Sequence, residues 1–444
     1  MVLFQSIKKQ RQLLLLKILR SIGYLTGLFL LGWEASHIYS YYFFQPYITV
    51  IGSVCMADGI GRQSVELLSE LEKKVIVDFI PTTKTSLKDV PSTMKKVLRT
   101  RYKKLGRIIL FEDCIWVPDK SHYQLLENIN REEHICLAYS MFESTEIPKT
   151  WVYALNKYFD AVIVPDPFHI DIYKQNGVTI PIFVLPLGLN LSDFLEQPLK
   201  SEANTPFIFA SLGAGISRKN IVKSIDAFAK VFKNRQDVQF LIHCRYALPE
   251  VEKEIKEYIA SNTLDNVLYS CKRLSRDKYR ELFQSIDCYV NLSKGEGFSI
   301  QPREAMALGI PVILTNNTAQ KTICSSGLVK SVPATIPLPA ERRWGGMVQS
   351  AEIYGTEFDC RIEDASQAFL DMYTNYHKFL SKNSLAREWA EQYDYSQLRP
   401  LYLSLVQPKR VILSDQNEIQ KNCIITDNLS LYLKYKTLLH EQDL

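Results

Sequence analysis

The chain has 444 residues, of which 46% are hydrophobic and 23% charged, and its formal net charge is +5. These values are typical of a folded protein of about two to three domains, and they exclude a disordered chain and a strongly basic nucleic-acid-binding protein. The nine cysteines occur singly, without a C-x-x-C pair or any cluster at metal-ligand spacing, so we expect reduced thiols, no metal and no other cofactor.

Residues 1–45 form a basic and apolar N-terminal extension. Five cations and no acid occur among its first twenty residues: Lys8, Lys9, Arg11, Lys17 and Arg20. The apolar run at residues 21–33 is shorter than the ~20 residues that span a bilayer. Residues 11–33 therefore leave four interpretations open: a helix in the membrane interface, a signal anchor, a cleaved signal peptide, or a helix packed on the protein's own core. The aromatic cluster at residues 39–44 favours association with a membrane.

Residues 46–190 alternate short apolar runs with segments of helical length. The first run, YITVIGS, leads into a loop in which Gly59 and Gly61 precede an amphipathic helix, and this loop is a candidate to face a ligand. Later runs read KVIVDFI, RIILF, HICLAY, FDAVIVP and IFVLP. Continuous Val/Ile/Leu runs alternating with helices predict a parallel sheet covered on both faces, and hence an α/β, Rossmann-like domain.

A basic stretch lies within this first domain, at residues 95–107. It carries seven cations and no acid: Lys95, Lys96, Arg99, Arg101, Lys103, Lys104 and Arg107. Two interpretations remain open. The stretch is either a solvated helix face or a patch that docks the protein on anionic lipid or binds a charged acceptor.

A polar, proline-bearing linker follows residue 188, and a second α/β alternation occupies residues 200–390. Its apolar runs read PFIFASL, VQFLIH, NVLYS, DCYVNL and GIPVIL. After the first run, the loop GAGISRKN places Ser217 as a candidate N-cap, followed by Arg218 and Lys219. Cations are unfavourable at the positive end of a helix dipole, so this pair indicates a bound anion such as a diphosphate.

The stretch VNLSKGEGFSIQPREAMALGIPVIL predicts a buried strand, a glycine loop, a short helix beginning near Pro302 and another buried strand. Glu296 lies in the loop and Glu304 in the first turn of the helix. The backbone N–H groups of Gly297, Phe298 and Ser299, next to the helix N-terminus, suit a phosphate. We therefore predict a nucleotide site here.

This stretch resembles the E-x7-E signature of retaining glycosyltransferases with two Rossmann-like domains, the group 1 or family 4 enzymes. The segments S-M-F-E-S-T, L-N-x-x-F-D and V-x-P-L-G, between residues 140 and 188, strengthen the resemblance, which covers roughly residues 47–405. It implies the GT-B fold: an acceptor domain at 46–190, a nucleotide-sugar domain at 200–390, and a crossover helix at 391–410 that returns to the first domain. The tail at 411–444 matches nothing in the family.

The resemblance also implies roles for individual residues. Arg218 and Lys219 would grip the donor diphosphate, Glu304 would bind the ribose diol, and Glu296 would orient the donor sugar. Arg273 falls in the region that lies beside the nucleotide base in this family. Glu143 stands where many relatives have histidine, so it is either a general base or a positioning residue.

One departure from the family pattern concerns the phosphate grip. Relatives often carry an arginine directly after the first strand of the second domain, where this chain has GAG at residues 213–215. The grip is thus left to Arg218 and Lys219.

Together these expectations describe a metal-independent, retaining hexosyltransferase that uses a UDP- or GDP-sugar. Its acceptor would be a membrane-linked or envelope glycan or lipid, and its location the cytoplasmic side of a membrane. The alternative is a non-catalytic, glycosyltransferase-like binding or scaffold protein. A third possibility is another enzyme on the same scaffold, such as a phosphorylase or epimerase, but no lysine in an apolar pocket suggests the phosphorylase cofactor.

Overall fold

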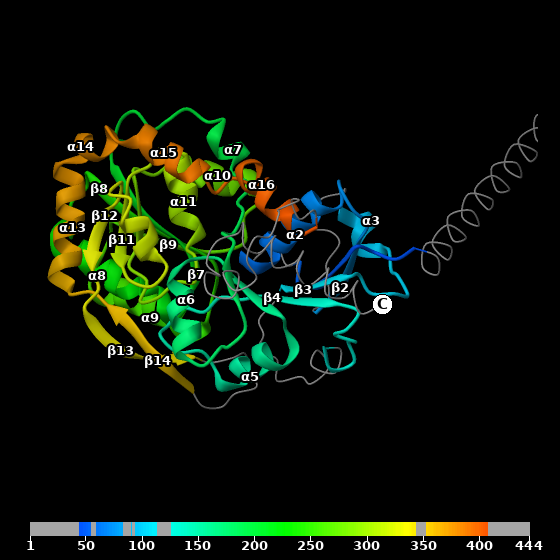
Figure 1. The fold of residues 1–444 in the computed structure, drawn as a ribbon. Helices are drawn as coiled ribbons and strands as arrows, with labels where there is room; N and C mark the ends of the chain where they lie inside the picture. Colours follow the sequence, from blue (N-terminus) through cyan, green and yellow to red (C-terminus); the bar gives the residue numbers. More distant parts are fainter. Residues whose placement is uncertain are drawn as a thin grey trace, which may run out of the picture.

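The computed structural model describes residues 44–54, 59–82, 90, 94–112, 126–342 and 352–406. These residues form two lobes, each built around a six-stranded sheet (Figure 1). Every strand pairing in both sheets is parallel. The predicted α/β architecture with two Rossmann-like domains is therefore confirmed.

The sheet of the first lobe has the order β2-β1-β3-β4-β5-β6. Its strands are β1 (Ile48–Gly52), β2 (Val77–Pro81), β3 (Ile108–Glu112), β4 (Ile135–Tyr139), β5 (Ala161–Val164) and β6 (Ile182–Val184). Four of these strands, β1, β3, β4 and β5, are wholly buried because helices cover both faces, and this burial explains their uninterrupted apolar sequences. The strand order changes direction between β1 and β3, since β2 lies on one side of β1 and the later strands on the other, which makes their carboxyl ends a switch point.

The described part of this lobe contains the helices α2 (Gly59–Leu71), α3 (Met94–Arg99), α5 (Lys149–Tyr158) and α6 (Phe168–Gln175). Gly59 and Gly61 lie in the first turn of α2, and not in the loop that the sequence predicted. A Cβ on Gly59 would lie 3.2 Å from the Ile300 side chain of the other lobe, so this turn faces the second lobe across the cleft.

The sheet of the second lobe has the order β12-β11-β10-β7-β8-β9. Its strands are β7 (Phe207–Gly215), β8 (Val238–Ala247), β9 (Val267–Cys271), β10 (Cys288–Asn291), β11 (Val312–Asn316) and β12 (Lys330–Pro333). Read from β9, this is the order of the dinucleotide-binding Rossmann fold. Its switch point lies between β7 and β10, the two strands that precede the predicted cationic loop and the predicted glycine loop.

The helices of the second lobe are the short 3₁₀ helix η1 (Ser217–Lys219), α8 (Ile221–Phe232), α9 (Pro249–Ser261), α10 (Arg276–Gln284), α11 (Ile300–Ala307), α12 (Gln320–Cys324), α13 (Ile362–Thr374) and α14 (Tyr376–Leu380). Two predicted details are wrong. Ser217 is not the N-cap of α8, since η1 intervenes and Asn220 occupies that position. Helix α11 begins at Ile300, two residues before Pro302. Proline is still tolerated there because the N–H groups of the first turn have no intrahelical partner.

An unpredicted hairpin, β13 (Ile336–Arg342) and β14 (Glu352–Asp359), joins β12 to α13. It reaches the first lobe. The backbone N–H of Thr145 donates to the Thr356 carbonyl at 3.2 Å, and the Ser144 hydroxyl donates to the Tyr354 carbonyl at 2.7 Å. The hairpin therefore closes one side of the cleft.

The two lobes are also joined by α7 (Ser192–Leu195), α15 (Asn383–Glu391) and α16 (Tyr395–Ser404). Helix α16 lies against α2 of the first lobe (Figure 1). The Gln63 amide of α2 donates to the Tyr402 hydroxyl at 2.7 Å, and the Arg399 guanidinium lies 2.6 Å from the Glu70 carboxylate. The end of the chain that the structure describes thus returns to the lobe in which it began.

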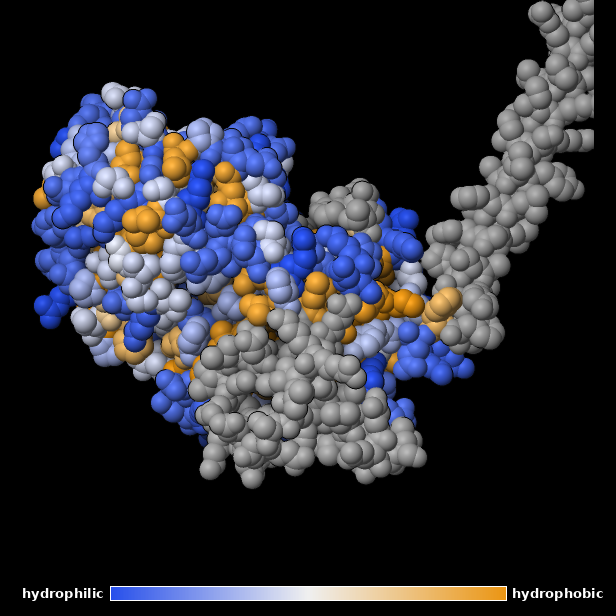
Figure 2. Space-filling model, turned by 45° about the horizontal axis from the view of Figure 1, so that its top comes forward, coloured by the Kyte–Doolittle hydropathy of each residue, from blue (hydrophilic) through white to orange (hydrophobic). Residues whose placement is uncertain are grey.

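Figure 2 shows a mainly hydrophilic face on the second lobe, with apolar side chains in small separate patches. Within the residues described, no helix is both long enough and apolar enough to cross a bilayer. The predicted membrane-associating segment at 11–33 and the tail at 411–444 lie outside the described residues. Of the predicted basic patch, Lys96, Arg99 and Lys104 are exposed on and after α3.

Candidate active site between the lobes

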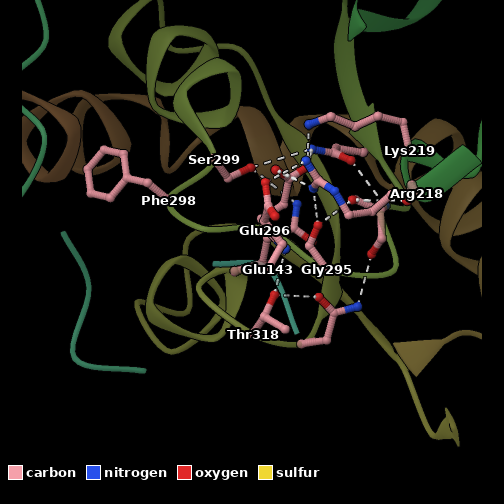
Figure 3. Close-up of polar contacts among 12 residues, drawn as sticks. Glu143, Arg218, Lys219, Gly295, Glu296, Phe298, Ser299 and Thr318 are labelled. Carbon is pink, nitrogen blue, oxygen red and sulfur yellow. Dashed lines mark hydrogen bonds and ion pairs between the residues drawn. The ribbon is translucent and has the colours of Figure 1, made fainter. Parts of the chain in front are cut away.

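Four predicted residues meet where the carboxyl ends of the two sheets face each other (Figure 3). The Arg218 guanidinium lies 3.0 Å from Glu296 through Nη1 and 3.1 Å from Glu143 through Nη2. The Lys219 ammonium forms a short ion pair with the other oxygen of Glu296. Three of these groups come from the second lobe and Glu143 comes from the first, so the cluster spans the cleft.

The backbone around η1 fixes the two cations. Asn220, with φ of 56°, turns the chain from η1 into α8, and its side chain donates to the Asp359 carboxylate at 2.7 Å. The Arg218 carbonyl accepts from the Lys294 N–H at 2.9 Å and from the Ser293 hydroxyl at 3.2 Å. The cationic loop and the glycine loop are thus held side by side.

The charges in the cluster are strongly coupled. Burial alone would raise the pKa of Glu296, but Lys219 and Arg218 outweigh burial and bring the pKa to about 2. Burial lowers the pKa of Lys219 in spite of its carboxylate partner. We take the ionised pair as the state near neutral pH, because the carboxylate accepts from both cations. Arg218 and Lys219, which could have been solvated charges, are therefore partly buried and paired.

Two glycines allow the lobes to approach at this point. A Cβ on Gly295 would collide with the backbone carbonyl of Glu143, and a Cβ on Gly297 would lie 3.2 Å from the Met141 side chain. Larger residues would force the lobes apart. The glycines of this loop are thus needed for close packing of the lobes, in addition to any approach of a ligand.

The rest of the glycine loop turns sharply into α11. Ser299 has φ of 68°, in the left-handed region, and its hydroxyl accepts from the Asn291 and Gln320 amides at 3.4 and 3.3 Å. The Phe298 ring points away from the charged cluster (Figure 3). Only the backbone of Phe298 can serve the predicted phosphate site, as the sequence analysis supposed.

Glu304, the other carboxylate of the predicted signature, is completely buried and already has two partners. The Arg62 guanidinium of α2 lies 2.7 Å from Oε1, and the Tyr279 hydroxyl of α10 donates to Oε2 at 2.7 Å. Burial would lower the pKa of Arg62, but Glu304 outweighs burial and raises it. The position predicted for the ribose is thus occupied by a cation from the first lobe.

The pairing of Arg62 with Glu304 was not predicted from the sequence, because 242 positions separate the two residues. The place of Arg62 directly after Gly61, in the loop predicted to face the cleft, was the available signal. Tyr279 was missed because it reads as an ordinary apolar position of α10.

A hollow of about 250 Å³ opens at the switch point of the second sheet. It is lined by Ser211, Leu212, Gly213, Ala214, Lys219, Ile221, His243, Cys244, Tyr289 and Asn291. The hollow borders Lys219 at the carboxyl ends of β7, β8 and β10. This is the place where open α/β sheets bind ligands.

A third cation, Arg245, stands beside the loop in which the family arginine is missing. Gly213 pairs with Cys244 and Ala214 with Tyr246, so Arg245 is the extra residue of a β-bulge opposite residues 213 and 214. Its Nε is buried without a hydrogen-bond partner in the part of the chain described. By contrast, Arg273 is exposed, and no described contact joins it to the cluster.

A second hollow, of about 310 Å³, lies at the switch point of the first sheet. Its walls are Ile60, Gln63, Glu112, Tyr139, Ser140, Met141 and Trp151. Met141 also contacts Gly297, so this hollow adjoins the glycine loop from the opposite side of the cleft. The two hollows therefore flank the cluster of Arg218, Lys219, Glu296 and Glu143.

Comparison with protein families and solved structures agrees with this arrangement. Residues 194–330 match the family model described as "Glycosyl transferases group 1", so the predicted resemblance is confirmed for the second lobe. No curated protein matches the sequence.

Several solved structures share the fold. A glycosyltransferase from Rickettsia africae has a TM-score of 0.60 and 15% identity over 82% of this chain and 99% of its own. Anabaena HepE in complex with UDP and glucose has a TM-score of 0.55 and 14% identity over 80% and 97%. TarM from S. aureus has a TM-score of 0.51 and 16% identity over 68% of this chain, which spans only 54% of TarM. The GT-B fold is thereby confirmed.

Proposed function

We propose that this chain, whose second lobe matches the group 1 glycosyltransferases, transfers a hexose from a nucleotide sugar to a glycan or lipid acceptor with retention of configuration. The observation that carries the proposal is the cluster of Arg218, Lys219 and Glu296 beside a hollow at the switch point of the second sheet. Two partly buried cations at that point suit the diphosphate of a nucleotide sugar.

The chemistry needs stabilisation of the diphosphate as its bond to the anomeric carbon breaks. Arg218 and Lys219 are held by backbone and carboxylate contacts before any ligand arrives, so they cost little reorganisation. A single preorganised donor of this kind is worth ~3 kcal/mol of barrier. Side-chain cations can supply this stabilisation without a metal ion.

Glu296 would orient the donor sugar. Its carboxylate holds both cations, and its backbone N–H donates to the Thr318 hydroxyl at 2.8 Å, so the side chain has little freedom. A fixed carboxylate next to the diphosphate can accept hydrogen bonds from sugar hydroxyls. We assign this role to Glu296. In the donor complex, Lys219 and Arg218 would bind both the Glu296 carboxylate and the phosphates.

Glu143 faces the cluster from the acceptor side. Its side chain is 29% exposed and lies 3.1 Å from Arg218. A phosphate that binds Arg218 would compete with this contact and release Glu143 toward the acceptor. We propose that Glu143 then positions the acceptor hydroxyl and receives its proton. The hollow beside Glu112 is the proposed place of the acceptor.

The UDP ligands named for HepE make a uridine nucleotide the first donor to test, although they describe that protein alone. The exposed cations on and after α3 support the further proposal that the acceptor is attached to an anionic membrane, on its cytoplasmic side. Binding of the chain to vesicles with and without anionic lipid tests that part separately.

A non-catalytic role is the second candidate, and one observation favours it. Both oxygens of Glu304 and both cations of η1 are already engaged by protein groups. A protein that only binds or scaffolds could keep such a closed site.

The test is a thermal-shift screen with UDP-, GDP- and ADP-sugars, followed by measurement of free nucleotide released from any sugar that binds. Wild type and Glu304→Ala are compared. The proposal expects stabilisation by one nucleotide class, loss of that stabilisation in the variant, and slow release of nucleotide by wild type. Binding without release would favour the non-catalytic role, and no shift with any nucleotide would contradict donor binding.

A further inference from the structure

Arg303 is the most unusual charged residue of the second lobe. It lies in α11 next to Glu304, and its side chain is completely buried. Its guanidinium carbon lies 3.8 Å from the ring centre of Phe298, 4.3 Å from that of Tyr393 and 5.5 Å from that of Trp389. Three aromatic rings thus surround one buried cation.

The hydrogen bonds that Arg303 donates to the backbone go to the predicted donor loop, and its guanidinium also interacts with the Tyr393 side chain. Its Nη1 donates to the Ser299 carbonyl at 2.9 Å and makes a shorter contact with the Phe298 carbonyl. Its Nε and Nη2 have no hydrogen-bond partner among the described residues. Arg303 therefore holds Phe298 and Ser299, the residues that lead into α11, of which Ser299 has a left-handed backbone conformation.

This arrangement is a poor way to gain stability. Burying an arginine without a carboxylate partner costs several kcal/mol, only partly offset by cation–π contacts. A positive charge in the first turns of a helix also opposes the helix dipole. Burial lowers the pKa of Arg303, which reflects the same cost. An apolar residue of similar volume would fill the space at less cost.

We propose that Arg303 is a positioning residue for the donor site, which fixes the turn at Phe298 and Ser299 and adds buried positive charge behind the donor phosphates. The inference rests on the proposed function, because only an anionic ligand at this turn would gain from the charge. In a region of low dielectric, one charge acts over several ångströms even without direct contact.

The same aromatic group connects the donor turn to the junction between the lobes. The Tyr393 carbonyl accepts from the Leu189 N–H at 2.8 Å, in the segment that joins the two lobes. The Phe298 and Tyr393 ring centres lie 5.7 Å apart. Arg303 thus stacks between the donor turn and the inter-lobe connection.

Arg387 of α15 offers a matched control. It too links α11 to its surroundings, since Nε donates to the Ala307 carbonyl and Nη2 to the Gln197 carbonyl, both at 2.8 Å. These contacts lie at the far end of α11 from the donor turn. A purely structural arginine in this region should behave like Arg387.

The experiment is calorimetric titration of wild type, Arg303→Met, Arg303→Lys and Arg387→Met with UDP, GDP and ADP, together with their melting temperatures. We expect Arg303→Met to weaken binding of the preferred nucleotide about tenfold while its melting temperature stays level or rises. Arg303→Lys should recover part of the affinity, because it retains the charge. Arg387→Met should bind like wild type.

Wild-type affinity in Arg303→Met would overturn the inference. So would an equal loss of affinity in Arg303→Met and Arg387→Met together with lower melting temperatures, because that pattern reports general damage to α11. If wild type binds none of the three nucleotides, the proposed function fails and the inference fails with it. The wild-type titration distinguishes these two failures.

Discussion

The two carboxylates at the ends of the glycine loop and α11 are both buried, but they are held in different ways. Glu296 is paired with Lys219 and Arg218 of its own lobe. Glu304 is paired with Arg62 of the other lobe. The Glu296 end is therefore organised whether the cleft is open or closed, whereas the Glu304 end keeps its cationic partner only while the lobes stay together.

This difference divides the site into a preformed part and a part that depends on closure. The preformed part carries the charges that a diphosphate needs. The closure-dependent part coincides with the position expected for the ribose, so a nucleotide that uses Glu304 must exchange places with Arg62. The predictions below act on one part or the other.

The largest effect is expected at the preformed end. Lys219→Met removes a partly buried cation from the proposed phosphate site and leaves Glu296 with Arg218 alone. We expect kcat/KM for the nucleotide sugar to fall by about 100- to 1000-fold. Lys230→Met, which changes an exposed lysine of the following helix α8, is the control. Equal values of kcat/KM for the two variants in steady-state kinetics would contradict the assignment of Lys219 to the phosphate site.

A smaller loss is expected at the closure-dependent end. Glu304→Gln keeps the shape of the side chain but removes the charge, so it weakens hydrogen bonds to a ribose diol and leaves Arg62 without its counter-ion. Nucleotide affinity should fall by about tenfold, as for the loss of one charge-assisted hydrogen bond. Calorimetry measures this change, and unchanged affinity would show that the ribose lies elsewhere.

Arg62→Ala tests the proposed exchange between Arg62 and the nucleotide by removing Arg62. It removes the group that competes with the nucleotide for Glu304, so we expect affinity to rise, by about three- to fivefold. The melting temperature without nucleotide should fall, because a contact between the lobes is lost and Glu304 is left buried without its cation. Weaker nucleotide binding in this variant would mean that Arg62 assists the ligand instead of competing with it.

The last prediction involves no ligand and concerns the dependence of stability on pH. The pKa of Glu296 is about 2 in the folded chain, below its usual value near 4.5. A lowered carboxyl pKa stabilises the fold above the unfolded value, and this contribution disappears as pH falls from about 4.5 to 2. Wild type should exceed Glu296→Gln by ~1–3 kcal/mol in unfolding free energy at pH 6 and lose this advantage near pH 2, as measured by denaturant titration. A difference in unfolding free energy that does not change with pH would show that ionisation of Glu296 does not provide this stability.

The sheets could be predicted from the sequence because buried parallel strands leave continuous apolar runs such as RIILF and DCYVNL. The hairpin β13–β14 was missed since β13 contains two prolines and is largely exposed, and β14 mixes charged and apolar residues of which only two are buried. Such a segment has no periodicity to detect, and its position depends on contacts with residues 144 and 145.

The residues of the site can also be divided into those that the sequence predicts and those that it does not. Arg218, Lys219 and Glu296 could be predicted because each stands next to a recognisable strand or glycine loop. The partnership of Arg62 with Glu304 could not, because it depends on how two lobes pack. Arg303 reads as a surface charge in sequence, and only its burial among three aromatic rings shows otherwise.

A crystal structure of the chain with the nucleotide that binds best tests the central claim most directly. The account predicts the diphosphate within hydrogen-bond distance of Arg218 and Lys219, and the ribose on Glu304 with Arg62 displaced. A nucleotide bound elsewhere, or a ribose distant from an intact Arg62–Glu304 pair, would contradict it.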